Sequence, residues 1–265
     1  MFSGMKEEIS TITKQKAAPV QSVARALGIL ECFYEHNELR LTDISHMLNL
    51  NKSTTHGLVK TLESFGFLSQ NKENEKYKLG AAIFRLGNNM DSSLRSLAKI
   101  SLATLVQEFG ETANLSVRVG DKNMFLEKLE SPFSMRISTS LGQLFPLYLT
   151  AMGKCMLAYL SEDEINSILA HTEYVRYTEK SLMSSEEVLI QLKDIRENGF
   201  SIDDEERECG LICVAVPIFD EKNEVMAALS VSGPTLRMTQ AKISAIISKL
   251  RQEAHKLQKS LISLK

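Results

Sequence analysis

Three short helical patterns followed by a hairpin pattern occupy residues 20–80, and this order constrains the fold more than any other feature. Apolar residues recur there at the three- and four-residue steps of an amphipathic helix. The segments with this period are 23–34, 41–48 and 52–62. Gly66 ends the third, and two strand-like segments then flank the polar turn 71–75. We predict a winged helix-turn-helix over residues 20–80.

The chain on either side of this segment differs from it in pattern. Residues 1–19 mix charges with Ser and Thr and carry no apolar period, so we expect a flexible arm. A further helical pattern leads toward a long helix around 94–109 and predicts a helical linker over 81–92. Residues 93–265 are left for a second, larger domain.

Strand-like and helix-like patterns are both present beyond Gly110. Strands are predicted at 113–119, 123–129, 135–139, 213–219 and 225–231. Helices are predicted at 150–160, 162–170, 184–198 and 239–265. Short polar turns join neighbouring strands, so we expect an α+β fold built on a mainly antiparallel sheet.

Composition is that of a globular protein. Of the 265 residues 43% are apolar, yet no stretch approaches the roughly 20 consecutive apolar residues of a membrane helix. The N-terminus lacks the pattern of a signal peptide, so we expect a cytoplasmic protein with no membrane partner. The four cysteines are expected to be free thiols. A formal net charge of −2 gives no global signal for nucleic acid, so a DNA-binding prediction depends on local arrangement.

The third helical segment begins with short polar side chains, and the hairpin carries lysines. A helix-turn-helix places such side chains in the major groove, where they meet base edges and phosphates. Lys76 and Lys78 are two apart on a strand and share one face, which suits contact with the DNA backbone. The predicted DNA-binding residues are Lys52, Ser53, Thr54, Thr55, His56, Lys60, Lys76 and Lys78. In the alternative interpretation, the Ser and Thr residues only cap the helix and the lysines are solvated without contacting DNA.

Three blocks of sequence, in order and over about residues 20–260, resemble the IclR-type transcriptional regulators. The first consists of Gln21–Leu27, Ser53–His56 with Thr61–Leu62, and Tyr77–Gly80. The second consists of Pro146 with Thr150–Lys154. The third consists of Asp203–Glu206, Gly210, Cys213 and Ala228–Pro234.

The resemblance implies a sequence-specific DNA-binding regulator, with a winged helix-turn-helix, a helical linker and a GAF-like C-terminal domain for effector binding and oligomerisation. It implies homodimers or tetramers on double-stranded operator DNA. The implied effector is a small organic acid or aromatic metabolite, and we expect a carboxylate. Some members repress and others activate; we expect repression. Where similar proteins carry Arg after the recognition-helix His, this chain has Gly57, which removes a base or phosphate contact.

The resemblance also implies an effector site between one face of the sheet and the helix that starts near Thr150. The matching residues are Phe145, Ala151, Met152, Asp203, Cys213, Ser230 and Ser232. Ser230 and Ser232 are two apart in a strand, so both hydroxyls point to one face, where they need a partner. The helix start adds backbone N–H groups for an anion.

Several of these residues also have an ordinary structural interpretation. Cys213 is a small buried hydrophobe in that interpretation, and Asp203 is solvated or caps a turn. Lys154 forms an ion pair as easily as it guides an anion, so we assign it no role. Cys209 and Cys213 are four apart but have no histidine nearby, so we predict neither a metal nor a cofactor.

Enzyme signatures are missing from the sequence. It has no G-x-G-x-x-G, Walker loop, G-x-S-x-G or H-E-x-x-H motif, so we expect no catalytic residues and no enzyme. Two alternatives stay open. One is a cytosolic small-molecule-binding or enzymatic domain with a non-functional helix-turn-helix, and the other is a structural interaction module.

Overall fold

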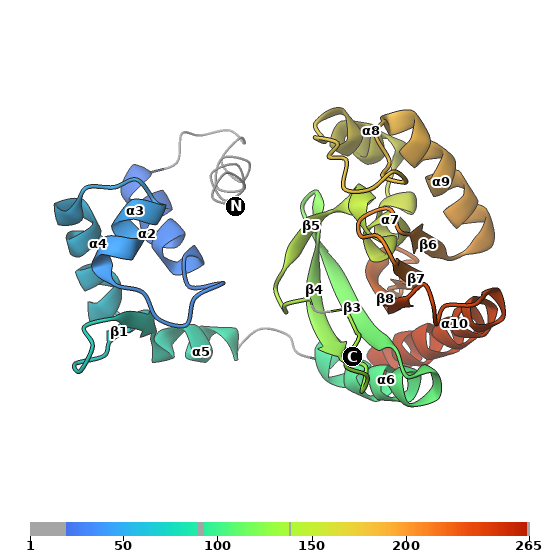
Figure 1. The fold of residues 1–265 in the computed structure, drawn as a ribbon, viewed down its shortest axis with the longest axis horizontal. Helices are drawn as coiled ribbons and strands as arrows, with labels where there is room; N and C mark the ends of the chain where they lie inside the picture. Colours follow the sequence, from blue (N-terminus) through green and yellow to red (C-terminus); the bar gives the residue numbers. More distant parts are fainter. Residues whose placement is uncertain (1–19, 89–92, 138, 264–265) are drawn as a thin grey trace. The chain divides into compact units, whose positions relative to one another are not determined.

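The structure is a computed structural model that describes residues 20–88, 93–137 and 139–263 (Figure 1). The chain divides into two compact units, Met1–Asp91 and Ser92–Lys265. The predicted arm and the end of the predicted linker lie outside the described residues. Within the described part, no helix is both long and apolar enough to cross a membrane.

The N-terminal unit is a winged helix, as the sequence predicts. Its elements are α2 (Gln21–Glu31), α3 (Leu41–Met47), α4 (Lys52–Ser64), β1 (Leu68–Gln70), β2 (Tyr77–Leu79) and α5 (Ala81–Gly87). Ile29, Ile44 and Val59 bring the three helices into one core, and Leu68 and Tyr77 add the hairpin to it. The antiparallel β1 and β2 form the wing.

A close backbone approach fixes the base of this wing. Gly66 follows α4 with a φ of 76°, in the left-handed region that glycine adopts without strain. A Cβ at Gly80 would lie 2.1 Å from the carbonyl oxygen of Gly66, so a side chain is excluded at Gly80. The sequence therefore determines locally where the hairpin closes against the end of α4.

The C-terminal unit is built on one six-stranded antiparallel sheet with the order β5-β4-β3-β8-β7-β6. Its strands are β3 (Thr112–Val119), β4 (Lys122–Leu129), β5 (Leu144–Pro146), β6 (Ser201–Asp204), β7 (Leu211–Phe219) and β8 (Val225–Pro234). Its helices are α6 (Ser93–Phe109), the 3-10 helix η1 (Leu147–Leu149), α7 (Ala151–Ala158), α8 (Glu162–Ala170), α9 (Ser185–Asn198) and α10 (Gln240–Ser263). This is the expected α+β fold.

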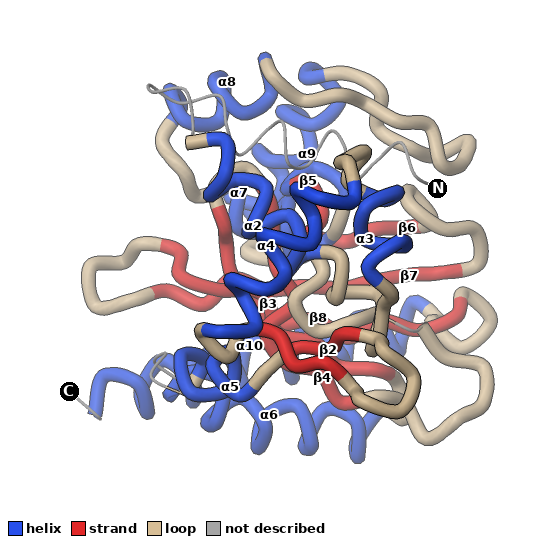
Figure 2. Tube along the Cα trace, turned by 90° about the vertical axis from the view of Figure 1, so that its left-hand side faces the viewer, coloured by secondary structure: helices blue, strands red, loops and turns tan. Residues whose placement is uncertain are grey.

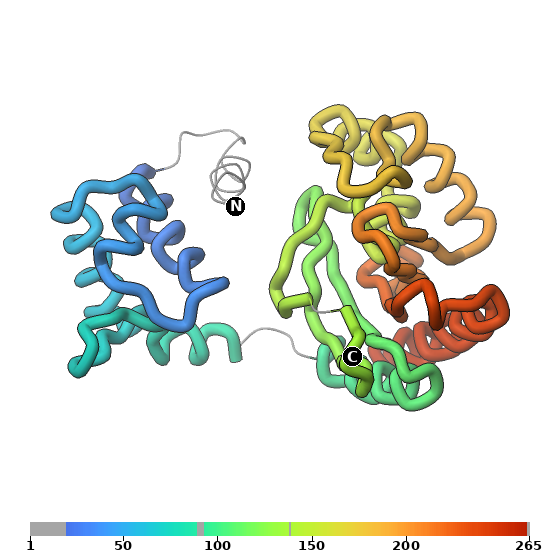
Figure 3. The backbone as a smooth tube through the Cα atoms, in the orientation of Figure 1, coloured from blue at the N-terminus to red at the C-terminus, as the bar shows by residue number. Residues whose placement is uncertain are grey.

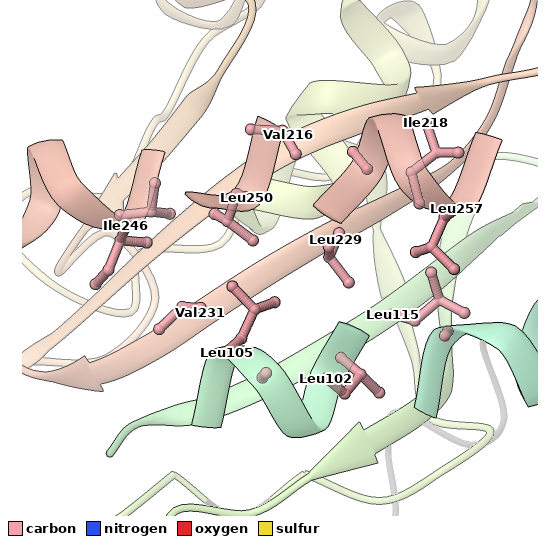
Figure 4. Packing of buried hydrophobic residues seen from close by; sticks show 14 of the residues in the cluster. Leu102, Leu105, Leu115, Val216, Ile218, Leu229, Val231, Ile246, Leu250 and Leu257 are labelled. Carbon is pink, nitrogen blue, oxygen red and sulfur yellow. The ribbon is translucent and has the colours of Figure 1, made fainter. Parts of the chain in front are cut away.

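Helices cover both faces of this sheet (Figure 2). On one face α6 and α10, from opposite ends of the unit, lie side by side (Figure 3). Leu102 and Leu250 of these helices pack there against Leu115, Leu229 and Val231 (Figure 4). The other face packs on α7, with α8 and α9 beyond it, and has its own core. Because side chains alternate along a strand, the residues between those of the α6–α10 core face α7.

The sequence prediction places one strand wrongly and misses two strands, β5 and β6. The prediction of a strand at 135–139 is wrong for its described residues, and β5 is the strand that pairs with β4. The Met135 carbonyl accepts a hydrogen bond from Arg237 at 3.0 Å, so a side chain occupies a group that a strand would use for pairing. Strand β6 was not predicted, because Ser201–Asp204 is short and polar and resembles a loop.

Candidate functional site

The outer surface of α4 carries most of the predicted DNA-binding side chains. Asn51 caps the helix, since its side-chain oxygen accepts from the Thr54 amide at 2.8 Å. Lys52, Ser53 and His56 are exposed beyond this cap, while Thr54 is half-buried. This surface is available to a macromolecular partner.

Thr55 does not share that surface. Its side chain is buried, and its hydroxyl donates to the Asn51 carbonyl at 3.0 Å. We therefore remove Thr55 from the predicted contacts, because its position one step round the helix turns it into the core beside Val59. Gly57 is exposed, and a Cβ there would meet nothing within 4 Å. A side chain could therefore begin at this position without a clash at its Cβ atom.

The wing places its lysines on its outer side. Tyr77 is buried between Lys76, which is half-buried, and Lys78, which is exposed. The ammonium of Lys60 lies 2.8 Å from the Glu63 carboxylate, and this hydrogen bond raises the pKa of Lys60. Lys60 is therefore a cation already paired with an acid.

Lys72, in the turn of the wing, is exposed and was not predicted. Its place in a polar turn gave no periodic signal. The basic residues of the N-terminal unit thus extend from α4 to the turn of the wing.

The side of the sheet that faces α7, which we call the inner face, is polar along β3, β6, β7 and β8. It comprises Thr112, Asn114, Ser116, Ser201, Asp203, Cys213, Ser230 and Ser232. The register sets Asp203 opposite Cys213 and Cys213 opposite Ser232. Ser230 lies opposite Asn114. Strand pairing thus brings together the predicted residues from β6, β7 and β8.

Apart from the half-buried Cys213, these inner-face residues are withdrawn from solvent. Ser230, Ser232 and Asp203 are 1%, 3% and 3% exposed. Burial raises the pKa of Asp203 to about 6, although its carboxylate accepts from the Glu206 amide at 2.9 Å. Burial also raises the pKa of the Cys213 thiol, which is therefore protonated at neutral pH. A buried polar surface of this kind needs partners.

Helix α7 packs against this side of the sheet. Thr150 caps the helix, accepting from the Gly153 amide at 3.0 Å and donating to Asn123 at 3.2 Å. A Cβ at Gly153 would lie 2.3 Å from the Leu147 carbonyl oxygen, so glycine is required for this approach. The amides of Ala151 and Met152 have no acceptor within the helix, as in the first turn of any α-helix. They are donors suited to an anion.

Lys154 has the structural role that the sequence left open. Its side chain is fully buried. Its ammonium donates to Glu206 at 2.5 Å, Gln191 at 2.6 Å and the Ile202 carbonyl at 3.1 Å. These three partners satisfy all its protons, so Lys154 ties α7 to α9 and to the β6–β7 connection.

Arg207 is a charged residue of this region that sequence reasoning missed. It follows β6, and its guanidinium lies 4.2 Å from the centroid of the Phe145 ring. Phe145 belongs to β5, at the opposite edge of the sheet from β6. The contact joins the two edges across the inner face and puts a cation there. An arginine within a run of acidic residues is usually solvated, so the sequence gave no indication that Arg207 lies at the inner face.

The inner face also holds side-chain atoms without a hydrogen-bond partner in the described structure. These are the Asn114 amide oxygen and the hydroxyls of Ser116 and Ser201. The sequence analysis did not select them, because single polar residues inside apolar strands are common in protein cores and do not by themselves indicate a binding site. Buried polar atoms are nearly always satisfied in folded proteins, so a cluster of unpaired ones indicates a place for a ligand or water.

The metal alternative finds no structural support in the cysteines. All four are free thiols, as expected, with Cys209 exposed and Cys213 half-buried. Among the described residues no three His, Cys, Asp or Glu side chains group closely enough to hold a metal.

A winged helix joined to a unit with a buried polar sheet face is the arrangement of a DNA-binding regulator with a sensor domain. Residues 22–72 match the IclR helix-turn-helix domain, and residues 89–259 match the bacterial transcriptional regulator IclR C-terminal domain. The chain therefore belongs to the IclR family. It is a DNA-binding transcriptional regulator, and its relatives are regulators rather than enzymes.

Individual relatives match over nearly the whole chain. The HTH-type transcriptional regulator XynR of Escherichia coli is 38% identical over 91% of this chain and 97% of its own length. The transcriptional repressor IclR of the same species is 34% identical over 88% and 86%. A crystal structure of an IclR-family regulator from Alicyclobacillus acidocaldarius superposes with a TM-score of 0.80 at 29% identity, covering 91% of this chain and 99% of that one.

Proposed function

We propose that the inner face and the start of α7 form the effector site, and that the effector is a small organic acid. The observation that carries this proposal is the burial of Ser230 and Ser232, two hydroxyls on one strand, on the side of the sheet that packs against α7. Hydroxyls and amides donate hydrogen bonds to a carboxylate. Arg207 adds a positive charge, and Phe145, Met152 and Ala151 add apolar surface. Asp203 and Cys213 complete the site beside Ser232.

We propose further that the α4 surface and the wing bind operator DNA. The contacts are Ser53, Thr54 and His56 for base edges, and Lys52, Lys60, Lys72, Lys76 and Lys78 for phosphates. Because one winged helix offers few cations, tight binding needs two half-sites and thus a homodimer or tetramer in the cytoplasm. We propose that operator binding represses transcription, as the name of the relative, transcriptional repressor IclR, states for that protein. Loss of DNA binding by the isolated monomer, with steep weakening by salt, tests this assembly.

The effector changes operator affinity only through its different affinity for the DNA-bound and free conformations, a coupling of about 1 to 3 kcal/mol. The Ser230→Ala/Ser232→Ala double variant should lose the effector's influence and keep effector-free operator affinity. Ser101→Ala is the matched control, because Ser101 is a buried serine on α6, which covers the other face of the sheet. Normal effector affinity in the double variant would place the site elsewhere.

A further inference from the structure

Asn114 occupies the centre of the inner face with half of its amide unused. It lies on β3 directly opposite Ser230 and is 1% exposed. Its amide nitrogen donates to the Ser230 hydroxyl oxygen at 3.4 Å. Its amide oxygen has no partner in the described structure. The residue therefore offers an acceptor in a place from which bulk solvent is excluded.

The bond between the two residues also determines what Ser230 offers. Because Asn114 donates to the Ser230 oxygen, the hydroxyl's own hydrogen is left for another acceptor. A donor from Ser230 and an acceptor from Asn114 thus stand side by side on neighbouring strands, about 5 Å apart at their Cβ atoms. A ligand that satisfies both must carry an acceptor and a donor on adjacent groups.

A carboxylate next to a hydroxyl meets this requirement. The carboxylate accepts from Ser230, and the hydroxyl on the neighbouring carbon donates to the Asn114 oxygen. We infer that Asn114 makes the effector site selective for 2-hydroxycarboxylates, an inference that depends on the proposed carboxylate effector. A 2-oxo acid offers only acceptors. The Asn114 side-chain amide could rotate so that its nitrogen donates to the oxo group. Its oxygen would then accept the hydrogen of the Ser230 hydroxyl, and the carboxylate of the ligand would lose its hydrogen bond from Ser230.

If Asn114 served only to fill space in the core, an apolar residue at this position would stabilise the fold more than an asparagine. Its neighbour on the strand face, Ser116, is also fully buried and also lacks a partner for its hydroxyl in the described structure. Two successive inner-face positions of β3 thus keep polar groups that the fold itself does not satisfy, at a cost to folding. A bound hydroxyl supplies the donor that the Asn114 oxygen lacks.

The experiment is calorimetry of the full-length protein with two matched trios of acids. The first is lactate, propionate and pyruvate, and the second is mandelate, phenylacetate and phenylglyoxylate. In the better-bound trio we expect the hydroxy acid to bind about tenfold more tightly than the acid without the hydroxyl, the usual value of one hydrogen bond to a buried group. The oxo acid should bind as weakly as the latter.

Variants assign this preference to Asn114. Asn114→Leu should bring the hydroxy acid to the affinity of its deoxy partner, whereas Ser230→Ala should weaken both. Asn114→Ala, which adds no bulk, replaces the leucine variant if thermal unfolding shows that the latter does not fold. Equal binding within both trios by wild type, or a preference kept in Asn114→Leu and Asn114→Ala, would overturn this inference and leave the proposed function intact. Binding of none of the six acids would overturn both.

Discussion

The α4 surface and the inner face of the sheet carry similar side chains in opposite environments. Lys60 on α4 is 47% exposed and pairs with one carboxylate, whereas Lys154 beside the inner face is 0% exposed and has three partners. The exposed polar side chains of α4, such as Lys52, Ser53 and His56, are solvated before any partner binds. Those of the inner face are desolvated during folding and depend on each other or on a ligand. Exposure thus suits a large partner, and burial a small one.

The largest effect that separates the two regions is expected from removing a buried charge. Lys154→Met should lower the free energy of unfolding of the C-terminal unit by about 3 to 5 kcal/mol, because Glu206 would be left buried and unpaired. Lys60→Met, the control at an exposed ion pair, should leave the free energy of unfolding of the N-terminal unit close to that of wild type. Urea unfolding followed by circular dichroism measures both. If the two variants unfolded at similar urea concentrations, the buried and the exposed lysine would not differ in their contribution to stability.

A second effect concerns the pH dependence of the inner face. Burial raises the pKa of Asp203 from 3.8 to about 6, so the folded state holds this proton more tightly than the unfolded state. The contribution of Asp203 to stability is therefore greatest below about pH 4 and falls as the pH rises through about 6. Its total size is about 2 to 3 kcal/mol.

Asp203→Asn tests this directly, because the amide cannot ionise. The variant should lose that decline between pH 4 and 6 and should be more stable than wild type at pH 8. Unfolding free energies across this pH range provide the measurement. If the difference in unfolding free energy between wild type and Asp203→Asn did not change with pH, the pH dependence could not be assigned to Asp203.

Much of the architecture was predictable because its signals are local. The three helices of the winged helix follow from apolar spacing, and the hairpin follows from its polar turn. The alternation that puts Ser230 and Ser232 on one side is a property of any strand. These features need only a few consecutive residues.

The missed features depend on contacts between distant segments. Strand β6 was missed because a four-residue polar edge strand carries little pattern of its own. Its pairing with β7 sets Asp203, which the sequence indicated only through the family resemblance, on the inner face. Arg207 reaches Phe145 across the width of the sheet. Thr55 was misjudged for another reason, since a run of polar residues at a helix start does not show which of them turns inward.

A third effect should appear on the exposed side. His56→Ala should weaken operator binding by about 1 to 3 kcal/mol if its ring meets a base edge, without loss of stability. Thr55→Val, which keeps the buried shape, should leave operator affinity near that of wild type. Gel-shift titration at fixed salt compares them. A larger loss of affinity from Thr55→Val than from His56→Ala would reverse our placement of the two side chains.

The smallest effect is expected from the wing. Lys76→Ala should weaken binding to operator and non-operator DNA alike, by less than about 1 kcal/mol per site, because an interaction with a phosphate carries no sequence information. The slope of log affinity against log salt should become shallower by about 0.9 for each phosphate that the variant no longer neutralises. A weakening confined to operator DNA would show instead that Lys76 reads bases.

The central claim is that the exposed surface and the buried inner face belong to one coupled regulator. Calorimetry can measure the affinity of the tightest-binding acid of the two trios with and without saturating operator DNA. Linkage requires that operator DNA change acid affinity by the same factor as the acid changes operator affinity, about 5- to 150-fold. We predict a change of this size in wild type and none in Ser230→Ala/Ser232→Ala. Equal acid affinity with and without operator DNA in wild type would contradict the account.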